Sequence, residues 1–352
     1  MDYIDVPDSK DFDLGVLYCK KCGAKNQVTK GLQVEKCVSC GVPFYTPMRL
    51  REYLIYKPLG GGGEGFVYKA SKKNSEQRFA IKLVPPSKKD MKILHERLLR
   101  DAQTASSIGH HKNLVELVEY GTEGENAFIV FKFINGERLD EFIAKRKHLS
   151  EKKSINIVKQ IIAAEEHICS KGFLYRDLKP ENILIERNGC VKLCDFGLCI
   201  PEHQALIQGV APDELEGSPL YIPPERIIGR SEGHFSEIYS LGMILFHMLK
   251  GKTLFSETEI KELLAKHIEA HGEKKLHEQL KKHTPKLISV LDKMLAQAPE
   301  ERYQDFISLK KDIDEAEKEI VSEPSLLLKT KDKKRSRLKK LNPKHWLDQF
   351  FG

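Results

Sequence analysis

The sequence YRDLKPEN at residues 175–182, followed by DFG at residues 195–197, decides the fold and the chemistry expected of this chain. Asp177 supplies a carboxylate that can receive the proton of a hydroxyl group. Asn182 and Asp195 supply oxygen ligands of the kind that hold magnesium on phosphate groups. Phosphoryl transfer needs both functions, and the order and spacing of these residues argue against coincidence.

A glycine-rich run, GGGGEGFV, lies upstream at residues 60–67. It fits the pattern Gly-x-Gly-x-x-Gly-x-Val through Gly60, Gly62, Gly65 and Val67. Glycines let the backbone approach phosphate closely, and backbone amides can donate to it. A dinucleotide-binding fold would continue into a helix, whereas the strand-like residues 66–70 favour a hairpin folded over a nucleotide. Alone this signal is weak, since glycine-rich turns occur for many reasons.

Two lysines supply positive charge. Lys82 lies in the apolar stretch Ala80-Ile81-Lys82, where a buried ammonium group costs free energy unless it has a negative partner. Phosphate oxygens and a helix carboxylate would be such partners, although an isolated lysine can also lie on the outer face of a strand. Lys179 follows Asp177 closely and can neutralise a phosphoryl group during its transfer.

Apolar periodicity predicts strands first and helices later. A small antiparallel sheet is expected up to about residue 84, with strands at 114–120 and 127–133. A helix is expected at 91–108, and Ser150 is the expected N-cap of another. Later helices are expected at residues 236–250, 258–270, 275–282, 285–297 and 303–320. This order indicates an α+β protein.

These motifs resemble the eukaryotic-type serine/threonine protein kinase family, including its bacterial members, over about residues 52–316. The resemblance implies a bilobal protein kinase fold with a small β-rich N-lobe and a helical C-lobe, ATP and magnesium as cofactors, and protein substrates. The motif DLKPEN at residues 177–182 resembles the corresponding motif of serine/threonine kinases rather than that of tyrosine kinases. The implied catalytic residues are Asp177, Lys179 and Asn182, and the implied magnesium ligands are Asn182 and Asp195. The implied ATP-binding residues are Gly60, Gly62, Gly65, Val67, Ala80, Lys82, Asp101, Phe131 and Leu184.

Asp101 is a departure from the family, which has a glutamate as the helix partner of this lysine. Counting back from residues 109–111 gives Asp101 as the partner of Lys82. Glu96 lies about one and a half turns earlier and faces elsewhere on a helix. Because aspartate is one methylene shorter, the helix must approach the lysine more closely.

Three other positions bear on the resemblance. Tyr175 replaces the usual histidine, in a role that is largely packing. Glu237 stands where the family has an aspartate that bonds the catalytic-loop backbone. Glu225 is expected to form a buried ion pair with Arg302, by the same resemblance.

The activation segment contains no Ser, Thr or Tyr between Leu198 and Glu216. The family often uses the arginine at the position of Arg176 to bind a phosphate on this segment. We expect Glu216 or Glu214 to replace that phosphate, so that the kinase needs no activation-loop phosphorylation. The alternative is that these acids are solvated loop residues.

Two Cys-x-x-Cys-Gly repeats define a small module at residues 19–45. Their thiolates, Cys19, Cys22, Cys37 and Cys40, can surround one zinc ion tetrahedrally, and the module resembles a zinc ribbon. So short a segment buries too little apolar surface to fold unaided, so metal binding would supply folding free energy. Unpaired thiols and an iron–sulfur centre are the alternatives. Whether the module binds a protein partner, nucleic acid or the kinase's own lobe stays open.

Charge is concentrated at the end of the chain. The 352 residues carry a net charge of +7, and residues 321–352 hold nine Lys and Arg against three acids. This basic tail, with its terminal aromatic residues, could dock on anionic lipid or nucleic acid, or could be a solvated segment. Residues 1–18 form an acidic N-terminal segment. No apolar run reaches the length of a transmembrane segment, and we expect a cytoplasmic protein.

Three functions are compatible with these observations. An active protein kinase is favoured because a scaffold has no need to keep Lys82, Asp177, Asn182 and Asp195 together. A pseudokinase scaffold that binds partners through the zinc module and tail is the main alternative. A small-molecule kinase is disfavoured by the intact substrate segment at residues 217–225.

Overall fold

The computed structural model describes residues 15–28, 30–62, 65–73, 75–84, 91–205, 218–257, 259–269 and 273–322. The chain divides into two compact units. The first contains residues up to 142 and residues 163–208, and the second contains residues 143–162 and the chain from 219 onward. Glu214, Glu216 and the tail from Lys329 onward lie outside the described residues.

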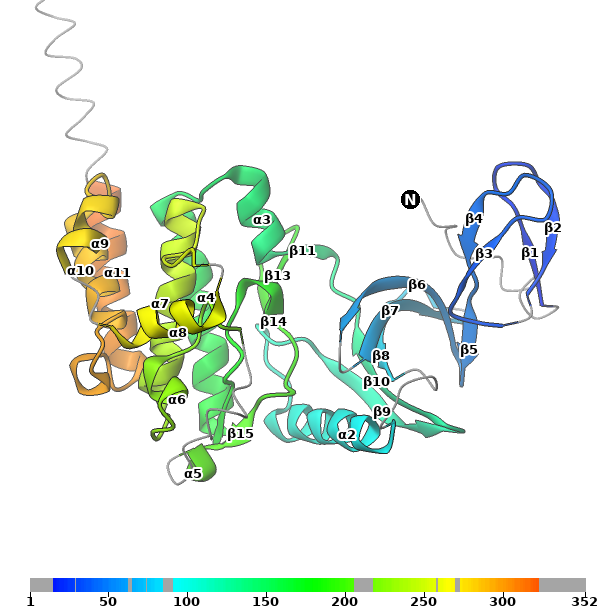
Figure 1. The fold of residues 1–352 in the computed structure, drawn as a ribbon, viewed down its shortest axis with the longest axis horizontal. Helices are drawn as coiled ribbons and strands as arrows, with labels where there is room; N and C mark the ends of the chain where they lie inside the picture. Colours follow the sequence, from blue (N-terminus) through cyan, green and yellow to red (C-terminus); the bar gives the residue numbers. More distant parts are fainter. Residues whose placement is uncertain are drawn as a thin grey trace, which may run out of the picture. The chain divides into compact units, whose positions relative to one another are not determined.

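A six-stranded antiparallel sheet dominates the first unit (Figure 1). Its order is β5 (Met48–Leu50), β6 (Tyr53–Gly62), β7 (Gly65–Lys72), β8 (Arg78–Leu83), β10 (Asn126–Lys132) and β9 (Leu117–Glu123). Strand β8 explains how the sheet presents two faces. Phe79, Ile81 and Leu83 are buried in one apolar cluster, so period-two alternation turns Ala80 and Lys82 to the opposite face.

Helix α2 (Met91–Ile108) packs against β10 and β9. Leu98 and Ala102 lie four residues apart, so they share the face that is buried with Ile129. This packing places Asp101, one residue before Ala102, near the sheet. The helix expected at residues 91–108 is therefore confirmed.

Short strands surround the segments that carry the YRDLKPEN and DFG motifs. A three-stranded sheet has the order β11 (Gly136–Arg138), β13 (Ile183–Glu186) and β14 (Val191–Leu193). The remaining elements are β12 (Phe173–Leu174), the 3-10 turn η1 (Pro180–Asn182), β15 (Ile200–Pro201) and α5 (Glu202–Ala205). Asn182 ends η1 and Asp195 follows β14 closely, so paired strands β13 and β14 fix their separation.

Two hairpins form the cysteine module, β1 (Val16–Tyr18) with β2 (Lys25–Gln27) and β3 (Val34–Lys36) with β4 (Pro43–Tyr45). Asn26 joins them because its side-chain oxygen accepts a 2.9 Å hydrogen bond from the amide of Val38. The segment that follows the module includes strand β5, which pairs with β6.

Helices make up the second unit. Their bounds are α4 (Glu151–Ser170, shared with the first unit), α6 (Pro224–Ile227), α7 (His234–Lys250), α8 (Ile260–Ile268), α9 (Glu273–Leu280), α10 (Pro285–Met294), η3 (Pro299–Glu301) and α11 (Phe306–Ser322). Helix α3 (Leu139–Arg146) also spans the boundary. The Ser150 hydroxyl accepts a hydrogen bond from the amide of Lys153, as its N-cap position predicts. The expected α+β class is confirmed.

The buried core of the second unit contains the expected ion pair. Arg302 donates to both carboxylate oxygens of Glu225, at 2.9 and 3.1 Å, and neither side chain is exposed. Glu225 also accepts a hydrogen bond from the Ser236 hydroxyl at 2.5 Å. Both charges are therefore compensated by bidentate pairing and by further hydrogen bonds.

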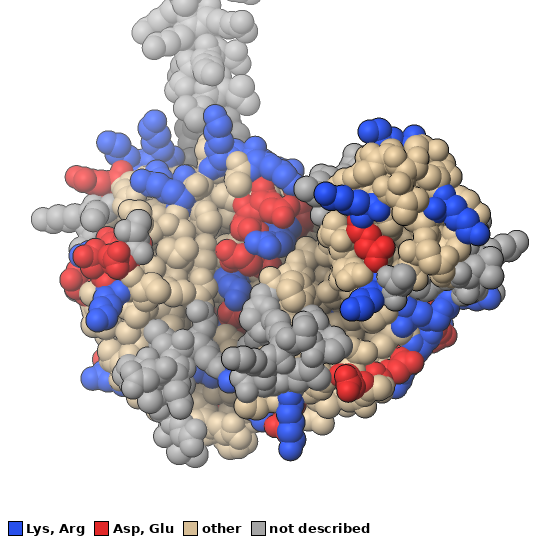
Figure 2. Space-filling model, turned by 45° about the vertical axis from the view of Figure 1, so that its right-hand side comes forward, with Lys and Arg blue, Asp and Glu red and all other residues tan. Residues whose placement is uncertain are grey.

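The surface carries charges of both signs, which intermingle on the face shown in Figure 2. In the part of the chain described here, no helix has the length and apolar character needed to cross a bilayer.

Candidate active site

A cavity of about 690 Å³ in the first unit contains most of the residues that the sequence singled out. Its apolar walls include Val67 from β7, Ala80 from β8, Phe131 from β10 and Leu184 from β13. The polar residues of the cavity include Lys82, Asp101, Asn182 and Asp195, and Gly60 and Gly65 lie at its glycine-rich edge. An apolar slot with polar groups at one end suits a nucleotide, whose base is flat and whose phosphates are charged.

Glycine is required in the hairpin that borders this cavity. The strands β6 and β7 pair up to Gly62 and Gly65, and Gly65 has a positive φ of 152°. A Cβ atom on Gly65 would lie 2.7 Å from the carbonyl oxygen of Leu83. Any other residue would therefore clash with β8 at this point.

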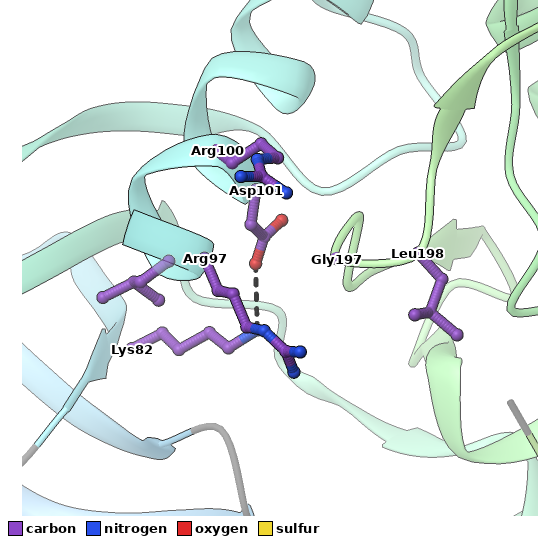
Figure 3. Close-up of a pocket in the computed structure, with 7 residues that line it drawn as sticks. Lys82, Arg97, Arg100, Asp101, Gly197 and Leu198 are labelled. Carbon is purple, nitrogen blue, oxygen red and sulfur yellow. Dashed lines mark hydrogen bonds and ion pairs between the residues drawn. The ribbon is translucent and has the colours of Figure 1, made fainter. Parts of the chain in front are cut away.

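Lys82 is shared between two carboxylates. Its Nζ lies 2.9 Å from Asp101 Oδ2 and 3.0 Å from Asp195 Oδ1. Figure 3 shows Asp101 extending from α2 toward the Lys82 ammonium group. The structure thus brings together the lysine of β8, its shorter helix partner and the aspartate of the DFG motif.

The electrostatics of this trio favour a charged Lys82 and a charged Asp195. Burial would lower the pKa of Lys82, but Asp195 and Asp101 raise it. Burial also raises the pKa of Asp101 and outweighs the attraction of Lys82. For Asp195, Lys82 outweighs burial and keeps the pKa below its ordinary value. One ammonium cannot fully compensate two carboxylates, the buried Asp101 and the partly exposed Asp195, so the site favours a further cation.

Asp177, Lys179 and Asn182 form a second cluster at the catalytic loop. Lys179 Nζ lies 2.9 and 2.8 Å from the two carboxylate oxygens of Asp177. The side-chain amide of Asn182 donates to Asp177 Oδ2 at 2.6 Å and to the Asp177 carbonyl at 3.1 Å. Burial raises the pKa of Asp177, and Lys179 opposes that rise.

Asn182 and Asp195 fit the role of magnesium ligands by their chemistry. The Asn182 amide nitrogen is used by Asp177, which leaves its oxygen as the acceptor of that side chain. Asp195 contributes a carboxylate with a lowered pKa. Magnesium prefers such hard oxygen ligands.

The backbone is strained on both sides of this chemistry. Arg176 and Asp195 each have a φ of 67°, a region that side chains other than glycine rarely adopt. Tyr175 contacts the residues on either side of Asp195. Its hydroxyl donates to the Cys194 carbonyl at 2.5 Å, and its ring contacts the Phe196 ring edge-on. Tyr175 is fully buried, so it connects the catalytic loop to the DFG segment by packing and by one hydrogen bond.

Two arginines were missed by the sequence analysis. Arg97 and Arg100 line a smaller cavity of about 120 Å³ together with Lys82, Asp101 and Leu198 (Figure 3). The signal was present, since Arg97 precedes Asp101 by four residues and therefore shares its helix face. We assign these arginines no catalytic role.

The four cysteines of the module also come together. All four sulfur atoms lie within 4.8 Å of one another, with Cys19 to Cys40 at 3.6 Å and Cys22 to Cys37 at 3.7 Å. Zinc–sulfur bonds of about 2.3 Å in a tetrahedron require sulfur atoms about 3.8 Å apart. The donor set and its spacing therefore fit a zinc ion.

The glycines of the two repeats shape the turns that carry these thiols. Gly23 and Gly41 have φ values of 72° and 70°, and their amides donate to the carbonyls of Cys19 and Cys37. Backbone amides of Cys40 and Ser39 lower the pKa of the Cys37 thiol to about 6. Backbone amides also lower the pKa of Cys19, whereas burial and the neighbouring thiols raise the pKa of Cys40 to about 11. Cys19 and Cys37 are therefore biased toward thiolate, the form that binds metal.

Comparison with known proteins agrees with this geometry. The protein kinase domain family matches residues 53–317. The serine/threonine-protein kinase PrkC of Bacillus subtilis is 33% identical over 218 residues, which are 62% of this chain and 33% of that protein. The serine/threonine-protein kinase ULK3 of Xenopus laevis is 32% identical over 267 residues, which are 73% of this chain and 54% of that protein.

The probable serine/threonine-protein kinase PknB of Lactococcus lactis is 29% identical over 218 residues, 62% of this chain and 34% of that protein. The chain therefore spans between about a third and about half of the length of these relatives. The family match covers about three-quarters of the chain and includes the whole nucleotide cavity and catalytic loop. On this match and this geometry, the chain belongs to the protein kinase domain family.

Proposed function

We propose that this chain transfers the γ-phosphate of ATP to serine or threonine hydroxyls of protein substrates. One observation carries the proposal: Lys82, Asn182 and Asp195 border a single cavity of nucleotide size, and Asn182 bonds Asp177 directly. The named specificity of the relatives supports serine and threonine as acceptors.

The catalytic loop would handle the proton of the substrate. Asp177 is the carboxylate that accepts the hydroxyl proton as the oxygen attacks phosphorus. Asn182 holds Asp177 in place through two hydrogen bonds. Lys179, within 3 Å of both Asp177 oxygens, moves to the transferring phosphoryl group and offsets its negative charge.

The cavity would position ATP. Val67, Ala80 and Leu184 enclose the base, Phe131 closes the inner end, and Lys82 binds phosphate oxygens. Asn182 and Asp195 would hold magnesium, which supplies positive charge on the phosphates. Asp101 keeps Lys82 oriented while Asp195 serves the metal.

The four-cysteine module would hold zinc as a structural ion. Four thiolates leave no open position for a substrate, which favours a structural over a catalytic role. We further propose a protein partner for this module.

The basic tail needs a separate test. Vesicle and nucleic-acid binding of the full chain is compared with that of a chain lacking residues 329–352. Weaker binding without the tail indicates a docking role, and equal binding indicates a solvated segment.

Phosphorylation of the activation segment would be unnecessary for activity. The support is the sequence, which offers no hydroxyl acceptor between Leu198 and Glu216. Enzyme treated with phosphatase should keep its turnover, measured after the phosphatase is removed. Complete loss of activity after that treatment would contradict the proposal.

The purified full chain, magnesium and labelled ATP provide the direct test, with a generic protein such as casein as acceptor. We expect label on serine or threonine, and its loss in Asp177→Ala and in Asp195→Ala. Glu96→Ala, an exposed change on α2, is the matched control and should leave turnover intact. ATP binding without any labelled polypeptide would indicate the pseudokinase scaffold, and label on small molecules alone would indicate a small-molecule kinase.

A further inference from the structure

We propose that the four-cysteine module positions the nucleotide-binding hairpin β6–β7, so that the metal-loaded module tightens the binding of ATP. This inference rests on the proposed kinase function for its meaning. Its structural basis is a set of contacts within the first unit that join the module to the glycine-rich turn.

Strand β5 is the first connection. It follows the module directly and pairs with the start of β6, with Met48 opposite Ile55 and Leu50 opposite Tyr53. Strand β6 continues from this pairing to the glycines of the turn. An ordered β5 therefore also holds the start of β6, the strand whose far end borders the cavity.

Shared core packing is the second connection. Tyr45, the last residue of β4, is buried in the cluster that contains Ile55, Tyr68 and Ile81 of the kinase sheet. Leu32, from the module, packs against the same cluster. The module and the sheet thus share one apolar core, and loosening either one exposes part of the other.

Close backbone contacts fix this packing. The amide of Leu32 donates to the Thr46 carbonyl, and the Thr46 amide donates to the Gln33 carbonyl, both at 2.8 Å. Thr46 is fully buried. Gly31 approaches Met48 so closely that an added Cβ would lie 2.7 Å from the Met48 Cβ. The loop at residues 31–33 is therefore held firmly against β5.

A row of three aromatic rings reaches the glycine-rich turn itself. Tyr45 stacks on Tyr68 with ring centroids 6.2 Å apart, and Tyr68 lies 6.4 Å from Phe66. Phe66 in turn covers Gly61, where an added Cβ would lie 2.3 Å from the ring. Since Val67 faces the cavity, alternation along β7 turns Phe66 and Tyr68 to its outer face. The row of rings thus packs against the face of the β6–β7 hairpin that is opposite the cavity.

Metal binding in the module should hold Tyr45, the first ring of this row, in its position. Tyr45 pairs with Val34 in the β3–β4 hairpin, and Cys37 follows β3 at the turn of that hairpin. The module's own apolar cluster consists mainly of Leu17, Phe44 and two of the cysteines, which is too little to hold the hairpin without an ion. Loss of metal therefore releases Tyr45 from its stacking partner.

The first test removes the metal from the full-length wild-type chain. Zinc-loaded protein is compared with protein treated with a zinc chelator, using hydrogen–deuterium exchange of peptides from residues 54–70 and titration with a fluorescent ATP analogue and magnesium. We expect faster exchange in these peptides and a dissociation constant raised by about two- to tenfold, as the loss of ring contacts implies. Added zinc should restore both. Unchanged exchange and unchanged affinity would overturn the proposal.

The second test breaks the aromatic row without touching the thiols. Tyr45→Ala should keep its zinc and raise the KM for ATP by about two- to tenfold, with kcat at saturating ATP nearly unchanged. Tyr45→Phe keeps the ring and should restore the KM. Val38→Ser is the control, because Val38 lies on the module with 78% of its surface exposed. Equal KM values in all four proteins would contradict the role of Tyr45.

Phe66→Leu provides a second route should Tyr45→Ala fail to fold. It removes the far ring of the row at a partly exposed position, so chelation should change the hydrogen–deuterium exchange of β6–β7 less in this variant than in wild type.

Hydrogen–deuterium exchange and binding of the ATP analogue can be measured without kinase turnover. A chain that responds to zinc but labels no protein would therefore reject only the proposed function. An active kinase whose hairpin ignores zinc would reject only this inference.

Discussion

The residue that organises the site is Lys82, because two carboxylates compete for its one ammonium group. Asp101 is almost entirely buried on α2, and Asp195 belongs to the DFG segment. Magnesium bound at Asp195 would leave Asp101 as the carboxylate that orients Lys82. The length of the Asp101 side chain therefore sets how close α2 must stay to β8.

Asp101→Glu should keep turnover or raise it. Glutamate adds one methylene and can reach Lys82 Nζ, now 2.9 Å from the aspartate oxygen, without requiring α2 to lie so close. Asp101→Asn should lower kcat/KM, because an amide carries no charge to hold the ammonium. Steady-state kinetics with varied ATP measure both changes.

Glu96→Ala is the control for this pair, since Glu96 is exposed on the same helix. A collapse of turnover in both Asp101→Glu and Glu96→Ala would show that Asp101 is not the working partner of Lys82. Wild-type rates in Asp101→Asn would show that the ion pair has no role.

Asp177 should give kcat an acid limb above the ordinary aspartate pKa of 3.8, because burial raises its pKa. The base must be unprotonated to act, so turnover is full above the raised pKa and is lost as the pH falls through it. Lys179 opposes the rise, and Lys179→Met should move the limb to still higher pH. Rates between pH 4 and 8 test this, with circular dichroism at each pH as the control for folding. A limb at or below 3.8, or one indifferent to Lys179, would refute it.

At the scale of elements, long periodic segments were predicted well and short ones were not. The helix at residues 91–108 and the N-cap at Ser150 follow from local signals, apolar spacing and a capping hydroxyl. Strand β5, with three residues, offers too little alternation to detect, and its pairing depends on the distant register of β6. Strand β5 therefore depends on a tertiary contact with β6, which no local pattern encodes.

Helix α11 begins at a cap that should make the second unit sensitive to acid. Asp305 Oδ1 accepts the Ser308 amide at 2.7 Å, and this bond lowers the pKa of Asp305 below its ordinary value. A depressed folded pKa gives stability that is present above the unfolded pKa and is lost as the pH falls through the folded one. Asp305→Ala should cost about 1 kcal/mol at pH 7.

Asp305→Asn separates the cap from the charge. Asparagine keeps the acceptor, so it should retain most of the stability at pH 7 while reducing the loss between pH 5 and 3. Urea unfolding at several pH values measures this, with the exposed Glu301→Gln as control. Identical pH profiles for wild type and Asp305→Asn would rule out the role assigned to the carboxylate.

For the whole molecule, the sequence singled out candidate catalytic residues that the structure brings together, because Asn182 bonds Asp177 and lines one cavity with Asp195. Asp177, Asn182 and Asp195 could be proposed because their residue types and spacing match the proton and magnesium requirements of phosphoryl transfer. The contacts of Tyr45 and Arg97 could not be found that way, since they depend on which faces of separate elements meet. Nothing in local spacing places Tyr45 against Tyr68, twenty-three residues later.

The buried pair of Glu225 and Arg302 should be costly to break. It joins α6 to the segment before α11 across 77 residues of sequence, and Arg302 also donates to the carbonyls of Ala296, Gln297 and Phe235. Arg302→Met would leave the Glu225 carboxylate buried without a counter-charge, at a cost of about 3–5 kcal/mol. Urea unfolding monitored by circular dichroism would measure the loss of stability.

The double change Glu225→Gln with Arg302→Met removes both charges. It should recover part of the lost free energy of unfolding, because an uncompensated charge costs more than a missing pair. If the double variant is no more stable than Arg302→Met, the loss comes from the carbonyls that Arg302 leaves unsatisfied, and the ion pair itself contributes little.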